Sequence, residues 1–409
     1  MKHSEKDKGS KVVYTDRAGG GSLKLRNFAV FLVLVLVVVG TSAFMYLKSK
    51  NVDIENMSFK DIVSELMDIT GNNGGNKIAK EIEFGANEKH VFTTCKGLII
   101  ESVKNRVKAL NEHGEEQWVV SVYAGNPIVK SAGSYIMVAD LGGKDVYLLS
   151  GKTLKWSQKM TGNIINADVN EAGYVSVVRE EKGYRGAVTI INKSGRVVIT
   201  KKMAKRFVFM SEVSPKGDNL VINGFDASGV KSKAVVILDD FSKDIKNALD
   251  TGETSLFPIV GFFDNGDLAA VGDSSVYLFD DKGKTKWVQK LTNKSVICGD
   301  LLTGDSIVAA LSDMDSSGKI TGNKTDITLI NEDGEKSVIY STDMRVKNIK
   351  TYNGIVAVNT GTSVYYINSK GKLLGKFDSK TNISDVHFIS RQKAVLVCKD
   401  SLIINNIHL

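Results

Sequence analysis

VYLFDDKGKTKW, residues 276–287, contains the pattern that decides the fold of this chain. An apolar strand leads into a polar turn at Gly283, and a second strand opens on Trp287. Two short apolar segments joined by a glycine turn are typical of a β-hairpin. The pattern recurs as VKALNEHGEEQW (107–118), VYLLSGKTLKW (146–156), VTIINKSGRVVI (188–199), VVILDDFSKDI (235–245), ITLINEDGEKSV (327–338) and VYYINSKGKLLG (364–375), with a partial copy, SLIINN, at 401–406. The hairpin is therefore an internal repeat.

Two further strands are expected before each hairpin. The nearer one recurs as LIIES from residue 98, YIMVAD from 135, YVSVVRE from 174, LVING from 220, LAAVGD from 268, IVAALSD from 307, IVAVNT from 355 and VLVCKD from 395. A shorter strand precedes it, for example NPIVKSA (126–132) or SDVHFIS (384–390). A repeat of about 40 residues with four strands is the signature of a β-propeller, whose stacked sheets bury each other's faces. The sequence thus predicts an all-β propeller of four-stranded blades over residues 78–409.

The number of blades follows from the number of repeats. We count eight units, and the eighth ends at Leu409 without room for a full outer strand. The strand-like segment IAKEIEF (78–84) precedes the first inner strand, so we expect it to supply the missing strand and close the ring. Eight blades are favoured, and seven stays open if one unit is a misread insertion.

Three tryptophans occupy equivalent positions in the outer strands, namely Trp118, Trp156 and Trp287. We interpret them as structural residues of the repeat that wedge between neighbouring blades. The strand, glycine turn and tryptophan resemble the quinoprotein-type (PQQ-like) propeller repeat, most closely in VYLFDDKGKTKW (276–287) and next in VYLLSGKTLKW (146–156). Together with the uncharged segment 28–47, which is interpreted as a membrane anchor in the next paragraph, the repeat also resembles an uncharacterised bacterial family of membrane-anchored propellers of unknown function. These resemblances imply an architecture and supply no catalytic residues.

A membrane anchor is predicted before the propeller. Residues 28–47, FAVFLVLVLVVVGTSAFMYL, carry no charge and are long enough to cross a bilayer as a transmembrane α-helix. Basic residues are concentrated in the tail 1–27, so we expect the N-terminus in the cytoplasm and the C-terminal domain outside. Cleavage of a signal peptide after Ala43 is the alternative. Residues 48–77 are expected to form a juxtamembrane amphipathic helix and a Gly/Asn linker.

Nucleic-acid binding is disfavoured by the distribution of charge. The formal net charge is +8. Half of it comes from residues 1–27, and the much longer remainder is nearly balanced, without a polybasic stripe.

Few residues have the pattern of a catalytic or metal site. Asp313 and Asp315 match the first half of a calcium loop, but Lys324 stands where a bidentate glutamate belongs, so an ordinary hairpin turn is favoured. His90 and His387 fall in the first and last inner strands and could approach each other, with a hydrogen-bonded structural role favoured over metal binding. We therefore expect no cofactor and no metal.

Cys95, Cys298 and Cys398 are too few for a disulfide framework. Because Cys95 and Cys398 fall in adjacent units, a ring-closing disulfide stays open beside the simpler interpretation as small buried residues.

These observations favour a binding or scaffolding module at the cell envelope rather than an enzyme. Its partner would be an envelope protein, a peptide or a wall polymer. The alternative is a propeller enzyme with a central-channel site, either quinoprotein-like or polysaccharide-cleaving. The side chains that line the channel would distinguish these two hypotheses.

Overall fold

The computed structural model describes residues 78–85, 88–230, 232–242, 248–249, 251, 257–273, 275–302, 305–315 and 317–408. The predicted cytoplasmic tail, transmembrane helix and juxtamembrane segment therefore lie outside the described residues. Within the ranges given, no helix is both long and apolar enough to cross a membrane.

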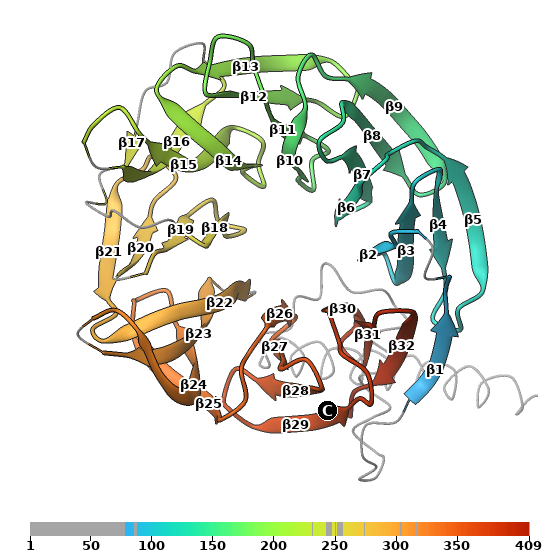
Figure 1. Ribbon diagram of the computed structural model, residues 1–409, viewed down its shortest axis with the longest axis vertical. Helices are drawn as coiled ribbons and strands as arrows, with labels where there is room; N and C mark the ends of the chain where they lie inside the picture. The colour runs from blue at the N-terminus through green and yellow to red at the C-terminus, as the bar shows by residue number, and fades with distance from the viewer. Residues whose placement is uncertain are drawn as a thin grey trace, which may run out of the picture. The chain divides into compact units, whose positions relative to one another are not determined.

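The described chain forms eight antiparallel sheets of four strands each, arranged as the blades of a propeller (Figure 1). In blades 1 to 7 the strands follow one another from the central channel to the rim, and the next blade begins again at the channel. In blade 8 the first three strands follow this order, and the outermost strand comes from the start of the described chain. The predicted all-β propeller is confirmed, and the blade number is eight rather than seven.

Blades 1 to 4 contain the strands between Val91 and Leu249. Blade 1 comprises β2 (Val91–Cys95), β3 (Leu98–Val103), β4 (Arg106–Leu110) and β5 (Glu116–Ser121). Blade 2 comprises β6 (Pro127–Ala132), β7 (Tyr135–Asp140), β8 (Asp145–Ser150) and β9 (Thr153–Lys159). Blade 3 comprises β10 (Ile164–Val169), β11 (Val175–Arg179), β12 (Gly186–Ile191) and β13 (Val197–Met203). Blade 4 comprises β14 (Arg206–Val213), β15 (Asn219–Asp226), β16 (Lys233–Asp240) and β17 (Ala248–Leu249).

Blades 5 to 8 follow in the same order. Blade 5 comprises β18 (Ile259–Phe262), β19 (Leu268–Val271), β20 (Ser275–Phe279) and β21 (Thr285–Lys290). Blade 6 comprises β22 (Lys294–Leu302), β23 (Ser306–Met314), β24 (Ile320–Ile330) and β25 (Lys336–Thr342). Blade 7 comprises β26 (Asn348–Tyr352), β27 (Ile355–Asn359), β28 (Ser363–Asn368) and β29 (Leu373–Asp378). Blade 8 comprises β30 (Asp385–Ser390), β31 (Lys393–Val397), β32 (Ser401–Asn406) and β1 (Ile78–Glu83).

Strand β1 closes the ring, as the sequence predicted. It pairs antiparallel with β32, from Ile78 opposite Asn405 to Glu83 opposite Ser401. The amide of Phe84 then donates to the carbonyl of Asp400. The two ends of the described chain therefore share one blade, which removes the free sheet edges that an open stack would expose.

The hydrophobic core is divided among the eight junctions between blades. Each core cluster joins side chains of two consecutive blades; for example, Val308 and Ala310 of blade 6 pack with Val356 and Val358 of blade 7. Burial of one valine side chain stabilises the fold by about 1.5–3 kcal/mol. The outer strands are much more exposed than the second and third strands, as β5 and β3 illustrate. No blade can therefore bury its faces without both neighbours.

Glycine turns of one blade receive the tryptophans of the blade before it. Gly195 and Gly334 have positive φ values of 80° and 83°. A Cβ atom at Gly195 would lie 3.0 Å from the Trp156 side chain, and one at Gly334 would lie 3.0 Å from Trp287. The glycine is thus required both by the turn and by the close approach of the indole ring.

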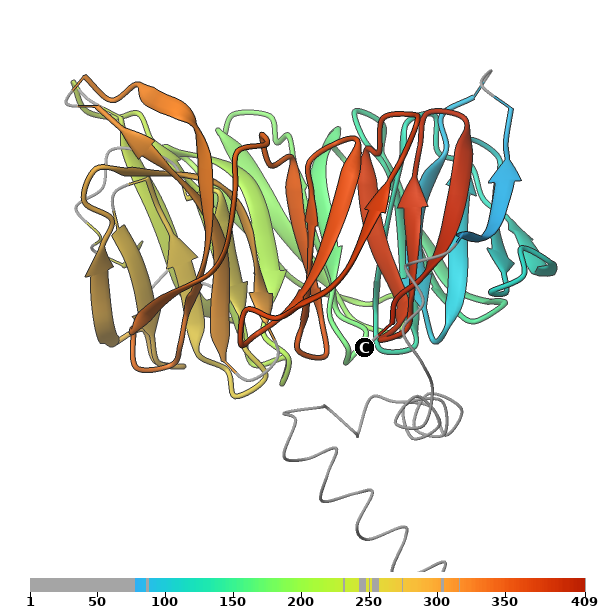
Figure 2. The same cartoon turned by 90° about the horizontal axis from the view of Figure 1, so that it is seen from below.

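The propeller has two faces with different turns. One face carries the connections between blades and the turns between second and third strands, and we call it the connector face. The other, which we call the hairpin face, carries the turns between first and second and between third and fourth strands. In Figure 2 the connector face is uppermost, and the long β23–β24 hairpin extends beyond it. The chain enters β1 at the hairpin face, because Ile78 pairs with Asn405 near the end of β32.

Candidate binding site

A hollow of about 540 Å³ lies on the connector face at blades 2 and 3. It is lined by residues of the β7–β8 turn, the β9–β10 connection and the β11–β12 turn, namely Lys144, Thr161, Gly162, Asn163, Glu180, Glu181, Lys182, Tyr184 and Arg185. Its volume falls in the range of pockets that bind small molecules or short peptide segments. We refer to it below as the hollow.

The wall of the hollow depends on a close contact between two chain segments. The connection between β9 and β10 passes against the end of β11 at Gly162. A Cβ atom at Gly162 would lie 1.9 Å from the carbonyl oxygen of Glu180, so no larger residue fits without displacing the backbone. The amide of Glu180 also donates to the carbonyl of Asn163. These contacts join the β9–β10 connection to the end of β11 at the rim of the hollow.

Both carboxylates of the hollow already have partners. Glu181 forms ion pairs with Arg179 and with Lys202, whose Nζ lies 2.8 Å from Oε1. The hydrogen bonds from these two side chains hold the pKa of Glu181 below its ordinary value. The Glu180 carboxylate accepts a hydrogen bond of 2.9 Å from the Asn163 side-chain amide.

Three cations of the hollow, in contrast, form no ion pair with any described carboxylate: Lys144, Lys182 and Arg185. The Arg185 guanidinium lies 5.0 Å from the ring centroid of Phe207, which itself stacks on Phe225. Tyr184 is 44% exposed, with Lys202 Nζ 5.2 Å from its ring centroid. The hollow therefore offers uncompensated positive charge beside an accessible aromatic ring.

The polar side chains of the inner strands are used to connect neighbouring blades. Thr93 Oγ1 of blade 1 lies 3.1 Å from Ser131 Oγ of blade 2. Lys130 of blade 2 pairs with Asp168 of blade 3 at 3.0 Å. Asp300 of blade 6 accepts hydrogen bonds from the amide and the hydroxyl of Thr351 in blade 7. These contacts fasten consecutive blades at the channel edge.

Glu212 on β14 is an inner-strand carboxyl group whose titration is strongly changed by the fold. It accepts a hydrogen bond of 3.3 Å from the amide of Phe262 in blade 5. Burial and the negative charge of Asp168 raise its pKa to about 8. Burial likewise raises the pKa of Asp300. Glu212 is therefore largely protonated at neutral pH.

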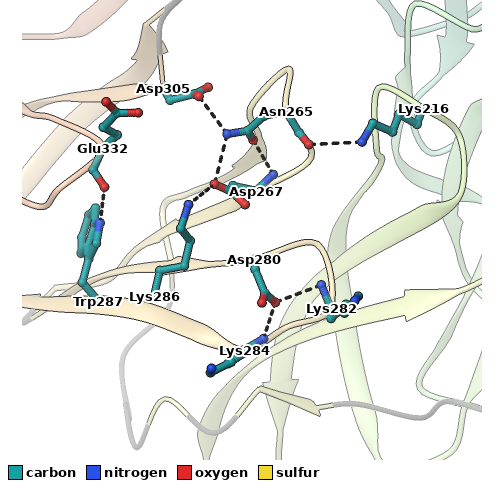
Figure 3. Close-up of polar contacts among 10 residues, drawn as sticks. All are labelled: Lys216, Asn265, Asp267, Asp280, Lys282, Lys284, Lys286, Trp287, Asp305 and Glu332. Carbon is teal, nitrogen blue, oxygen red and sulfur yellow. Dashed lines mark hydrogen bonds and ion pairs between the residues drawn. The ribbon is translucent and has the colours of Figure 1, made fainter.

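On the hairpin face, ionic and amide groups join blades 4, 5 and 6 (Figure 3). Lys216 of blade 4 donates to the carbonyl of Asn265 in blade 5. The side-chain amide of Asn265 donates to Asp305 of blade 6 at 2.8 Å and to Asp267 at 3.1 Å. Lys286 lies 2.7 Å from Asp267 and balances its charge. These polar groups contact one another across the junctions between blades 4, 5 and 6.

The structure gives His90 and His387 separate partners. His90 Nδ1 lies 2.5 Å from Glu101, which also pairs with Lys108 at 2.5 Å. Burial lowers the pKa of His90, and the charge of Lys108 acts in the same direction. His387 lies 3.3 Å from Asp385 within its own strand.

Asp313 and Asp315 also bind different groups. Asp313 pairs with Lys294 at 2.8 Å. Asp315 accepts hydrogen bonds from the amides of Ser317 and Lys319 and from the Ser317 hydroxyl, as in an Asx turn. In the described parts of the chain, no group of three or more His, Cys, Asp or Glu side chains has an arrangement that could hold a metal ion.

The three cysteines are free thiols. Cys95 is buried in the core between blades 1 and 2, and Cys398 in the core between blades 7 and 8. Burial raises the pKa of Cys95.

The repeat tryptophans lie at junctions between blades and do not line the hollow. Trp156 is 8% exposed and contacts the glycine turn of blade 3. Trp287 donates its Nε1 proton to the carbonyl of Glu332 in blade 6 at 2.7 Å (Figure 3). Trp118 packs against the core between blades 1 and 2.

The sequence analysis missed the hollow. Its only sequence signal is the charged segment Arg179–Gly186, in which Glu180 and Glu181 precede Lys182 and Arg185. Such a segment has the composition of an ordinary solvated turn. The segment becomes a site because Lys202 of β13 pairs with Glu181 and leaves Lys182 and Arg185 without this carboxylate as a partner.

The fold defines the chain as an eight-bladed β-propeller, and solved structures of similar fold have little sequence identity to it. BamB from Moraxella catarrhalis is 12% identical, with a TM-score of 0.51 over 81% of this chain and 99% of that chain. The C-terminal WD40 domain of Sif2 is 13% identical, with a TM-score of 0.55 over 82% and 99%. Chaetomium thermophilum Sqt1, solved bound to the N-terminus of the ribosomal protein L10, is 7% identical, with a TM-score of 0.57 over 80% and 99%. At these identities the similarity shows the fold alone.

A family of unknown function, DUF5711, matches residues 72–409. The chain therefore belongs to this family. No curated protein has significant sequence similarity to the chain.

Proposed function

We propose that the chain is a binding or scaffolding module that an N-terminal anchor holds at the cell membrane, with the propeller outside the cytoplasm. The anchor rests on the uncharged segment 28–47 and on the basic tail before it. A binding role is supported by the rigid closed ring, and by propellers of similar fold such as Sqt1, which was solved bound to a segment of another protein.

The observation that carries this proposal is the hollow. Ionic groups on the inner strands and on the hairpin face of blades 4 to 6 contact one another within the fold. The hollow combines cations that form no ion pair with a described carboxylate and an exposed aromatic ring. A folded protein gains little from such an arrangement, and a partner of opposite charge could use it for recognition.

Site-directed photo-crosslinking in intact cells tests this proposal. A photoreactive residue in place of Tyr184 is expected to capture a defined envelope protein, identified by mass spectrometry. The matched control places the same residue at Lys152, an exposed position on the hairpin face of blade 2. Equal products from both positions, or none from Tyr184, would contradict a binding role for the hollow. Protease accessibility of the propeller in spheroplasts tests its predicted location outside the cytoplasm.

A further inference from the structure

We propose that the ligand of the hollow is an acidic peptide segment of a partner protein, held by Lys144, Lys182 and Arg185. This inference rests on the binding role proposed above and specifies the chemistry of the partner.

The sign of the charge follows from which groups are already paired. Glu181 is compensated by Arg179 and Lys202, and Glu180 accepts the Asn163 amide. Lys144, Lys182 and Arg185 have no carboxylate partner among the described residues, so a ligand in the hollow meets net positive charge. Carboxylates of the ligand would form charge-assisted hydrogen bonds with these three groups.

Arg185 is already oriented for this task. Its guanidinium lies over the Phe207 ring, and Phe207 in turn stacks on Phe225 with ring centroids 4.9 Å apart. A guanidinium that stacks on an aromatic face keeps its N–H groups free at the edge for a carboxylate. Less side-chain entropy is then lost on binding than for an unsupported arginine.

The remaining wall favours a polypeptide over a phosphate polymer. Asn163 and Thr161 provide hydrogen-bonding groups, and Tyr184 provides a flat apolar surface beside the cations. A peptide has backbone amides and apolar side-chain atoms for these groups, whereas a polyphosphate chain has neither.

Fluorescence anisotropy with the full chain in detergent micelles tests the inference. The probes are a short labelled peptide rich in glutamate, the same peptide with glutamine in place of glutamate, and inorganic polyphosphate as a competitor. We expect the glutamate peptide to bind and the glutamine peptide to bind at least about fivefold more weakly. Added salt should weaken the binding, because these charges are partly exposed.

Variants of the hollow then locate the binding. Arg185→Glu and Lys182→Gln are each expected to reduce affinity for the glutamate peptide by about fivefold or more. Lys152→Gln, which removes the same charge from the hairpin face of blade 2, should leave the affinity unchanged. Equal loss with Lys152→Gln, or equal binding of both peptides, would overturn the inference. Stronger binding of polyphosphate than of the peptide would reassign the hollow to a phosphate polymer.

The proposed binding role and the proposed ligand chemistry can be contradicted independently of each other. If photo-crosslinking at Tyr184 captures a defined partner but the acidic peptide does not bind, the binding role stands and the ligand chemistry is wrong. If the peptide binds through Arg185 but no partner is captured in cells, the chemistry stands and the role in the envelope is wrong.

Discussion

Lysines at the hollow and lysines at the hairpin face of blades 4 to 6 differ in what they contact. Lys144 and Lys182 line the hollow without a described carboxylate partner. Lys216 and Lys286, in contrast, contact the carbonyl of Asn265 and the carboxylate of Asp267, and the Asn265 amide extends this chain of contacts to blade 6. The contrast separates charge that holds blades together from charge that is available to a partner. It also predicts how strongly each group should affect stability.

The largest effect on stability is expected at Lys201, because its ion pair is buried more deeply than those of the lysines compared above. Its side chain is 1% exposed and pairs with the buried carboxylate of Asp239 in blade 4 at 2.8 Å. Lys201→Met would remove the cation that lies beside this buried carboxylate, which should lower the free energy of unfolding by about 3–5 kcal/mol. Urea denaturation followed by tryptophan fluorescence measures the change.

The control for Lys201 removes both charges. Lys201→Met combined with Asp239→Asn should recover most of the lost stability, because no unpaired charge is then buried. A double variant as unstable as the single one would indicate that packing, rather than charge, accounts for the loss.

The next effect depends on pH and concerns Glu212. Its pKa of about 8, against an ordinary 4.5, means that the folded state favours the neutral carboxyl. This contribution is fully present below the unfolded-state pKa and is lost as the pH rises through about 8. Replacement by glutamine removes this titration, so the stability of the variant should fall less between pH 5 and pH 9, by up to about 4 kcal/mol at the alkaline end.

Thermal melting at a series of pH values tests this prediction. Glu116→Gln, at an exposed position on β5, serves as the control and should keep the slope of the parent chain. If the melting temperatures of the parent chain and of Glu212→Gln change with pH in the same way, Glu212 is not neutral in the folded state.

How much of this could be predicted from the sequence depends on the range of the interactions. The strands, the glycine turns and the closing role of residues 78–84 follow from local pattern and from the need to pair every edge. The turn Asp315–Gly318 is likewise local and has the form that its sequence suggested. The partners of Glu181 and Lys201 could not be predicted, because Lys202 and Asp239 come from other strands and a shift of one residue would reverse which face each side chain occupies.

A smaller effect is expected at Lys286. Its side chain is 45% exposed, and its hydrogen bond to Asp267 raises its pKa. Lys286→Gln should lower the free energy of unfolding by no more than about 1 kcal/mol, since solvent and salt screen the pair. The difference in melting temperature should shrink at high salt. Lys284→Gln, an exposed neighbour on the β20–β21 turn, should show no such salt dependence.

The smallest effect on stability is expected at Lys182. Because it forms no ion pair with a described residue, Lys182→Gln should change the free energy of unfolding by less than about 0.5 kcal/mol. The same variant is expected to weaken binding of the acidic peptide. Lys286→Gln should do the reverse, with a measurable loss of stability and unchanged peptide binding. Measurement of both quantities on both variants tests the comparison directly, because a lysine that only fills a surface position would alter neither.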